Sequence, residues 1–129
     1  LNDRVNKYNT YIQNKTGEII KERNLELNEL QEKYISEEQE IENLKKFSCD
    51  LFDRRTEDDD FLEVRLGLGK VAAKKVIEYK KQERLEIEDE LQLYPENIAN
   101  QYEYLMNAPI ICNFKNDNGV GIIGDEGCR

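Results

Sequence analysis

The chain has 129 residues, a net charge of −9 and no histidine. An acidic protein repels phosphate backbones and anionic lipid headgroups, so free nucleic acid is not an expected partner. Without histidine, a histidine general base and Ser-His or Cys-His pairs are excluded, and no apolar run reaches the roughly twenty residues of a membrane span.

Three widely spaced cysteines, Cys49, Cys112 and Cys128, form no CxxC pair. An odd number of cysteines in a chain without histidine argues against a disulfide framework and against a structural zinc site. We therefore expect a reducing compartment. The start at Leu1, without a methionine, and the end just after Cys128 indicate a piece of a larger protein.

Two helices are predicted in residues 1–48, over 2–33 and 37–48. Ser36 and Gln39 have the spacing of a capping box, in which each side chain satisfies a free amide of the first turn. Glutamates follow the cap and lysines end the segment, which is the order that the helix dipole favours. The second helix is therefore expected to be separate from the first.

Apolar residues recur at heptad spacing in the first helix, which indicates a narrow apolar stripe. The series that includes Ile19 resumes at Leu27 one residue out of phase, so we predict that no single straight seam runs through the helix. Gly17 weakens the helix by about 1 kcal/mol relative to alanine. Two interpretations stay open: a largely solvated helix, or a stalk that pairs with a second helix of the same or another copy.

The spacing of apolar residues changes from the period of a helix to the period of a strand after residue 60. Alternation of apolar with polar or small residues predicts a half-buried strand with one apolar face. The residues of that face are Leu62, Val64, Leu66 and Leu68. Gly67 and Gly69 are predicted to end the strand in a tight turn, and residues 71–79 to return as a second, antiparallel strand.

Residues 80–94, which include Leu85 and Ile87, are ambiguous and predict at most a loop with a short helical turn. Pro95 suits the first position of a helix, and the apolar spacing that follows predicts a helix over 95–106. Asn107 is expected to close this helix in the left-handed conformation.

Residues 110–114 form a compact apolar run that predicts a strand. Asn118 and Gly119 are the pair best suited to a two-residue hairpin turn, and residues 120–123 are predicted to return as the next strand. The predicted fold class is therefore α+β (mixed α/β): a helical stalk of two helices, then a small partial domain of about four strands and one packed helix.

No complete catalytic, metal-binding or nucleotide-binding motif is present. The acidic run around Asp58 and Asp60 lacks EF-hand spacing and contains arginines, so a dedicated metal site is not expected. A solvated acidic run also lacks the pocket that acid–base catalysis needs. The glycine-rich end of the chain lacks the lysine and hydroxyl of a phosphate loop, and Asp125 and Glu126 would repel an anion.

Arg54 and Arg55 say more about possible contacts than the acidic run or the glycine-rich end does. Successive residues in an extended turn point to opposite sides, so one guanidinium can hold the helical segment and the other the sheet, with Asp58 or Asp60 as partners. The alternative is an exposed pair that contributes less than about 1 kcal/mol. The residues by themselves leave both interpretations open.

The same stretch matches a longer family motif. The matching residues are Leu51, Phe52, Asp53, Arg54, Arg55, Asp58, Asp60, Phe61, Leu62, Val64, Arg65, Leu66, Gly67 and Gly69. Two later segments, 107–110 and 120–124, follow in the family's order. Together they resemble the membrane-anchored FtsK/SpoIIIE-type ATPases of type VII secretion, the EssC/EccC group. Phe52 stands where that family usually has tryptophan, Thr56 where it usually has proline, and the His-Pro step often seen there is missing.

The resemblance implies that residues 1–48 form a juxtamembrane stalk and that residues 49–129 begin a degenerate ATPase-like domain. ATP and magnesium would bind in downstream modules of the parent, and no cofactor is implied for this chain. The implied parent is a homo-oligomer, a hexamer, on the cytoplasmic side of the plasma membrane. Its implied partners are membrane components and a ubiquitin-like component of the secretion machine, and it exports WXG100-type proteins.

We therefore predict a non-catalytic connector or regulatory module that contacts other domains of the same motor chain. Its expected structural clasp, where the stalk enters the domain, consists of Arg54, Arg55, Asp58, Asp60, Phe61 and Arg65. Two alternatives stay open: a divergent nucleotide-binding domain whose phosphate loop begins at Gly124, and a coiled-coil scaffold unrelated to secretion.

Overall fold

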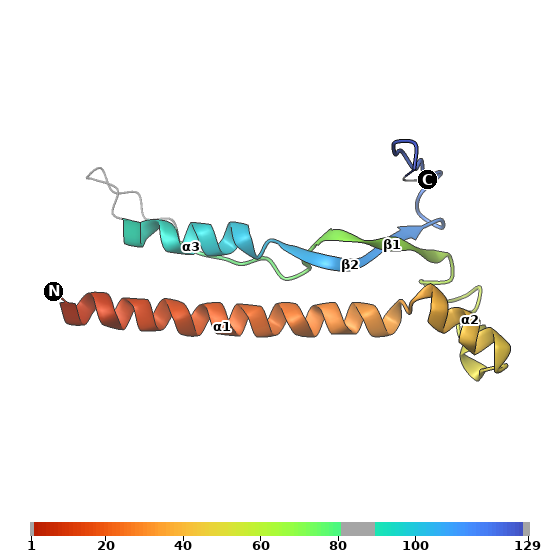
Figure 1. Cartoon of the computed structure of the whole chain (residues 1–129), viewed down its shortest axis with the longest axis horizontal. Coiled ribbons are helices and arrows are strands. Elements are labelled where there is room, and N and C mark those ends of the chain that lie inside the picture. The colour runs from red at the N-terminus through yellow and green to blue at the C-terminus, as the bar shows by residue number, and fades with distance from the viewer. Residues whose placement is uncertain (1, 81–89, 128–129) are drawn as a thin grey trace. The chain divides into compact units, whose positions relative to one another are not determined.

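The computed structural model describes residues 2–80 and 90–127. The elements, in chain order, are helices α1 (Asn2–Lys33) and α2 (Glu37–Lys45), 3-10 helix η1 (Cys49–Phe52), strand β1 (Glu63–Ala72), helix α3 (Glu90–Gln101) and strand β2 (Tyr104–Asn113) (Figure 1). The two strands form an antiparallel sheet. The predicted mixed α+β class is confirmed at this level. The predicted positions Leu85, Ile87 and Cys128 lie outside the described residues.

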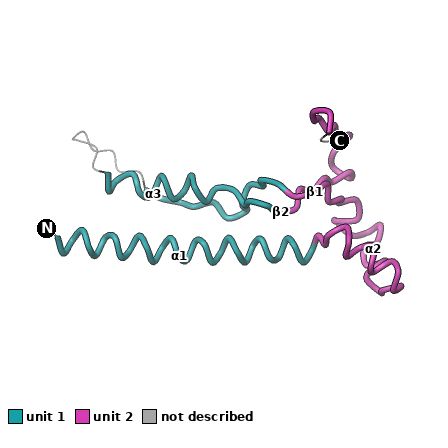
Figure 2. Tube along the Cα trace, viewed as in Figure 1, with its two compact units in different colours: residues 1–33, 69–108 teal, residues 34–68, 109–129 magenta. Residues whose placement is uncertain are grey.

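The chain divides into two compact units (Figure 2). Unit 1 consists of residues 1–33 and 69–108, and unit 2 of residues 34–68 and 109–129. Both strands of the sheet pass from one unit into the other, so each unit contains part of the strand pair. The separate assignment of residues 1–48 to a stalk stays a prediction.

Both predicted N-terminal helices are present. Helix α1 runs without interruption through Gly17, where an added Cβ would meet nothing within 4 Å. Helix α2 begins as the capping box predicts, because the Ser36 side chain accepts a hydrogen bond from the Gln39 amide. It ends at Lys45, and Phe47 follows in the left-handed conformation with φ of 51°.

The predicted break in the seam of α1 is wrong. Its half-buried and buried face comprises Val5, Tyr8, Ile12, Thr16, Ile19, Arg23, Leu27 and Leu30. These positions are spaced by three and four residues, which keeps them on one side of a helix. The face is continuous because Thr16 and the buried Arg23 occupy places that a count of apolar residues leaves empty.

Helix α3 contacts α1 within unit 1. Pro95 lies inside α3 rather than at its first position, so the predicted helix start at this residue is wrong. Proline has no amide hydrogen and cannot bond to the carbonyl four residues earlier, which belongs to Leu91. The Tyr8 hydroxyl donates to that carbonyl over 3.0 Å, so the neighbouring helix supplies a donor that Pro95 lacks.

The turn predicted at Gly67 and Gly69 is not formed. Both glycines lie inside β1, which continues to Ala72, so the second strand predicted over 71–79 is also wrong. Glycine permits a turn but does not require one, and β2, also ten residues long, pairs with β1 instead. The partner strand comes from a distant part of the chain, which local spacing does not reveal.

Strand β2 begins at Tyr104, within the segment predicted as the end of a helix over 95–106. Asn107 adopts the predicted left-handed conformation, with φ of 55°, but inside this strand. The strand predicted over 110–114 is therefore part of a longer one. Residues 118–123 form neither the predicted hairpin nor a strand, so the described residues contain two strands and not four.

The register of the sheet follows from two backbone hydrogen bonds. The Phe114 amide donates to the Leu62 carbonyl over 3.0 Å, and the Ala73 amide donates to the Glu103 carbonyl over 3.1 Å. The step from 62 to 73 equals the step from 103 to 114, so the strands pair without a net insertion. In this register Leu66 lies opposite Ile110.

The strand has the predicted single apolar face, and this face is the more exposed of the two. Residues alternate along the strand, and the half-buried positions begin with Glu63 and Arg65, whereas Leu66 and Leu68 are 43 % and 48 % exposed. A one-residue shift exchanges the two faces of a strand completely. The polar face is turned inward here because Glu63 and Arg65 bond to Tyr34.

Candidate functional site

The predicted clasp residues lie in a series of turns that leads into β1, within unit 2. The Asp58 carboxylate accepts from the Arg55 amide over 2.7 Å, and the Asp58 amide donates to the Arg55 carbonyl over 3.0 Å. The Phe61 amide then donates to the Asp58 carbonyl, and the Glu63 amide to the Asp60 carbonyl. Aspartate favours such turns because its short side chain bonds to nearby main-chain amides.

Arg54 fixes the end of this series through the main chain. Its Nη1 donates over 2.7 Å to the Glu63 carbonyl and over 3.4 Å to the Asp60 carbonyl. Its Nε also lies 3.8 Å from the Asp60 carboxylate, but both side chains are about 30 % exposed, so this ion pair contributes little. The short bond to Glu63 is the stronger contact because its donor is charged.

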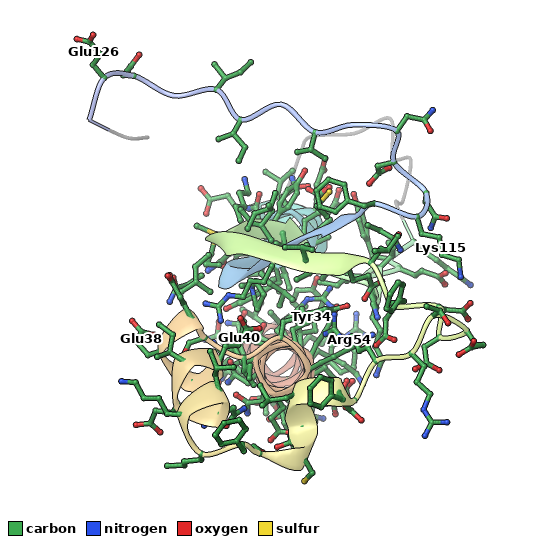
Figure 3. All side chains as sticks on the ribbon, turned by 90° about the vertical axis from the view of Figure 1, so that its right-hand side faces the viewer. Tyr34, Glu38, Glu40, Arg54, Lys115 and Glu126 are labelled. Carbon is green, nitrogen blue, oxygen red and sulfur yellow. The ribbon has the colours of Figure 1, made fainter. Side chains whose placement is uncertain are left out.

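Tyr34 is the residue on which the charged side chains converge. It follows α1 directly and is 8 % exposed. Its hydroxyl donates to the Glu63 carboxylate, and its carbonyl accepts from Nη1 of Arg65 over 3.2 Å. The Arg54 guanidinium lies 5.5 Å from the centre of its ring, within cation–π range, and Figure 3 shows the two side chains next to each other.

The structure thus brings Arg54 and Arg65 to Tyr34, places Asp60 beside Arg54, and places Asp58 in the preceding turn. The Arg55 side chain is exposed and makes no hydrogen bond or ion pair within the described part of the chain. Phe61 is 38 % exposed. The Arg55 and Phe61 side chains therefore add no hydrogen bond or ion pair to the cluster around Tyr34.

The remaining acids of this stretch are solvated. The Thr56 hydroxyl, which donates to Glu57, holds the pKa of that carboxyl below its ordinary value. Across residues 2–80 and 90–127 no three His, Cys, Asp or Glu side chains converge as metal ligands would. Residues 120–124 form no strand, and Ile123 is 97 % exposed, so this segment lacks the strand that precedes a phosphate loop.

A second polar cluster, in unit 1, was not predicted from the sequence. Arg23 of α1 is 8 % exposed and donates over 2.8 Å to the Tyr102 carbonyl and over 2.6 Å to the Lys75 carbonyl. It also pairs with Glu26, whose carboxylate accepts from the Lys74 amide over 2.7 Å. One turn of α1 therefore holds the chain at the end of β1 and at the end of α3.

An exposed ion pair lies beside this cluster. The Glu22 carboxylate bonds to Nζ of Lys75, which lowers the pKa of Glu22 and raises the pKa of Lys75. Both side chains are exposed to solvent, so salt screens their attraction. The buried Arg23 is therefore the principal contact of this turn.

Sequence reasoning missed Tyr34 and Arg23 for different reasons. Tyr34 continues the apolar spacing of the helix, and this spacing does not reveal that a buried aromatic residue with a hydroxyl needs a hydrogen-bond partner. Arg23 belongs to a residue type that is rarely buried without a partner, so its type gives no signal for the interior. The signal that could have identified it is its place on the helical face between Ile19 and Leu27, with Glu26 three residues further on.

No helix in the part of the chain that the structure describes is long and apolar enough to cross a membrane. Comparison of the sequence and the structure with known protein families, curated proteins and solved structures finds no match.

Proposed function

We propose that this chain is a non-catalytic connector of a membrane-anchored type VII secretion motor. The proposal rests on the ordered resemblance of residues 51–69, 107–110 and 120–124 to the EssC/EccC group. One structural observation supports it: Tyr34, the first residue after α1, is bonded by Glu63 and Arg65 and stacked by Arg54, all from the resembling stretch. In this role the cluster of Tyr34, Arg54, Glu63 and Arg65 mechanically couples the residue that follows α1 to β1, and we call it the joint.

The arrangement suits the transmission of force. Tension applied to α1 would act on Tyr34 through the main chain. The contacts of Tyr34 with Arg54, Glu63 and Arg65 would then transmit this force to β1 and to the turns before it. Arg54 and Arg65 are suited to such a joint because a guanidinium presents several donors in a fixed plane. Two of the acceptors, the carbonyls of Glu63 and Tyr34, belong to the main chain, so the contacts act on the backbone itself.

The same contacts favour a connector over the two alternatives. A guanidinium that donates to main-chain carbonyls is engaged within the protein, whereas a phosphate site needs free donors and cations. Asp125 and Glu126 lie next to Gly124 and would repel a phosphate. A self-associating coiled coil needs a free stripe on α1, but Tyr8 and Arg23 of that stripe bond to other segments of unit 1.

Replacement of Arg54 by alanine in the intact motor tests the proposal. We expect lower export of the secreted substrate and a loss of about 1–2 kcal/mol of folding stability in the isolated chain, because Glu63 loses its charged donor. Arg55→Ala is the matched control: it removes a neighbouring arginine whose side chain is exposed, and its expected change in stability lies within about 0.5 kcal/mol.

Secretion assays of both variants, with thermal unfolding of the isolated chain, separate the outcomes. Equal secretion by the wild type and Arg54→Ala would remove the assigned role. Equal loss in both variants would also contradict it, because a general effect of arginine removal would then account for the result.

A further inference from the structure

Unit 2 carries an exposed apolar sheet surface on the side of β1 that faces away from Tyr34. We call it the apolar face and define it by Leu62, Val64, Leu66 and Leu68 of β1 and its approach, with Ile110 and Phe114 of β2 and its end. Their exposed fractions run from 38 % to 48 %. The four β1 positions share one side of the strand because they alternate with Glu63 and Arg65.

The strand register adds the residues of β2 to this face. Phe114 lies directly opposite Leu62, and Leu66 lies opposite Ile110, and residues opposite each other project to the same side of a sheet. Cys112, opposite Val64, lies on the same side but is buried. The exposed apolar residues therefore follow one another along β1 in a strip, whereas on β2 Ile110 and Phe114 are separated by the buried Cys112.

Such a strip is unusual on a surface that faces only solvent. Contiguous apolar patches on soluble proteins mark interaction sites, whereas scattered apolar residues do not. A two-stranded sheet is also marginally stable by itself, and a sheet with one apolar face is normally covered by a second layer. The other face of β1 is occupied by Tyr34, so the missing layer belongs on the apolar face.

The dimensions and the charge of unit 2 indicate what the second layer is. Two strands lie about 4.8 Å apart, and a helix with its side chains is about 10 Å wide, so one helix covers the strip. Residues 34–68 and 109–129 carry seven Lys/Arg and fourteen Asp/Glu, a balance of −7. A second copy would bring the same negative charge to the contact, whereas a basic partner is attracted.

We propose that the apolar face docks an amphipathic helix of a partner, whose apolar stripe is flanked by lysine or arginine. The apolar stripe covers Leu66 and its neighbours, and the net negative charge of unit 2 attracts the flanking cations. This docking is independent of the secretion role proposed above, because it depends only on the surface and the charge of this chain.

The probe for the test is a labelled synthetic peptide of about 18 residues, five helical turns, built from leucine and lysine in amphipathic register. Fluorescence anisotropy measures its affinity for the full chain. Two peptides are its controls: one with the same composition in scrambled order, and one with glutamate in place of lysine. We expect the amphipathic basic peptide to bind at least about tenfold more tightly than either.

Matched substitutions locate the site. Leu66→Lys removes an apolar contact and places a cation against the basic helix, and we expect about tenfold weaker binding or more. Leu44→Lys makes the same change at a 60 % exposed leucine of α2 and should leave the affinity unchanged. Leu66→Thr, which keeps a strand-forming residue and adds no charge, provides a second variant, and circular dichroism checks that each variant is folded.

Several results would overturn the proposal. These are equal binding of the scrambled peptide, preference for the glutamate peptide, absence of binding, or equal affinity of wild type and folded Leu66→Thr. Two other occupants are also distinguishable. Self-association that Leu66→Lys abolishes in sedimentation would assign the face to a second copy, and nuclear Overhauser contacts from Leu66 to Ile122 would assign it to the chain's own end.

Discussion

Tyr34 combines two groups that a smaller or purely apolar side chain could not supply at this position. Its ring accepts the Arg54 guanidinium and its hydroxyl donates to Glu63, while its main-chain carbonyl, which any residue would offer, accepts from Arg65. The residue is nearly buried, so each lost partner leaves a polar group without compensation from water. Tyr34 in unit 2 and Arg23 in unit 1 each bond to segments that lie far from them in the sequence.

Arg23 gives the clearest prediction at the residue scale. Arg23→Met keeps the length of the side chain but leaves the carbonyls of Tyr102 and Lys75 without their donor and Glu26 without its cation. We expect a loss of about 3 kcal/mol, since breaking a buried ion pair typically costs that much. Denaturant unfolding measures it, and Lys21→Met at an exposed position of the same helix should change stability by less than about 0.5 kcal/mol. Similar losses in both variants would count against a special role for Arg23.

At the scale of the elements, the helix predictions succeeded where local chemistry decides the outcome. Ser36 and Gln39 identified the start of α2, and α1 has the predicted bounds. The strand predictions failed where the outcome depends on residues far apart in sequence. Gly67 and Gly69 fit both a turn and a strand, and the partner strand β2 decided between them. Which side of β1 is covered likewise depends on Tyr34, 29 residues before Glu63.

The pair of Tyr8 and Pro95 yields a prediction at this scale. Tyr8→Phe removes the hydroxyl that donates to the Leu91 carbonyl, and we expect it to lower stability by about 1 kcal/mol. In a Pro95→Ala background the alanine amide can bond to the same carbonyl, so the loss of the hydroxyl should cost less. A double-mutant cycle in denaturant unfolding measures the difference. Equal effects of Tyr8→Phe in both backgrounds would refute the compensation.

For the whole molecule, the sequence identified where helices give way to a strand, after residue 60. It did not identify which residues the charged side chains of that stretch contact. The predicted clasp listed Arg54 and Arg65, which the structure brings to Tyr34, and Asp60, which lies beside Arg54, but it omitted Tyr34. It also included Arg55, whose side chain is exposed. Spacing along a turn cannot distinguish a guanidinium that bonds to the main chain from its solvated neighbour, because their main-chain carbonyl acceptors carry no signature in the sequence.

The coupling between Arg54 and Tyr34 tests the central claim, that the charged stretch acts as a joint around the end of α1. A double-mutant cycle with Arg54→Ala and Tyr34→Leu, followed by denaturant unfolding, measures it, and Arg55→Ala with Tyr34→Leu is the reference cycle. We predict a coupling free energy of about 1 kcal/mol for the first pair and a value near zero for the second. Additive effects of Arg54→Ala and Tyr34→Leu would contradict the account.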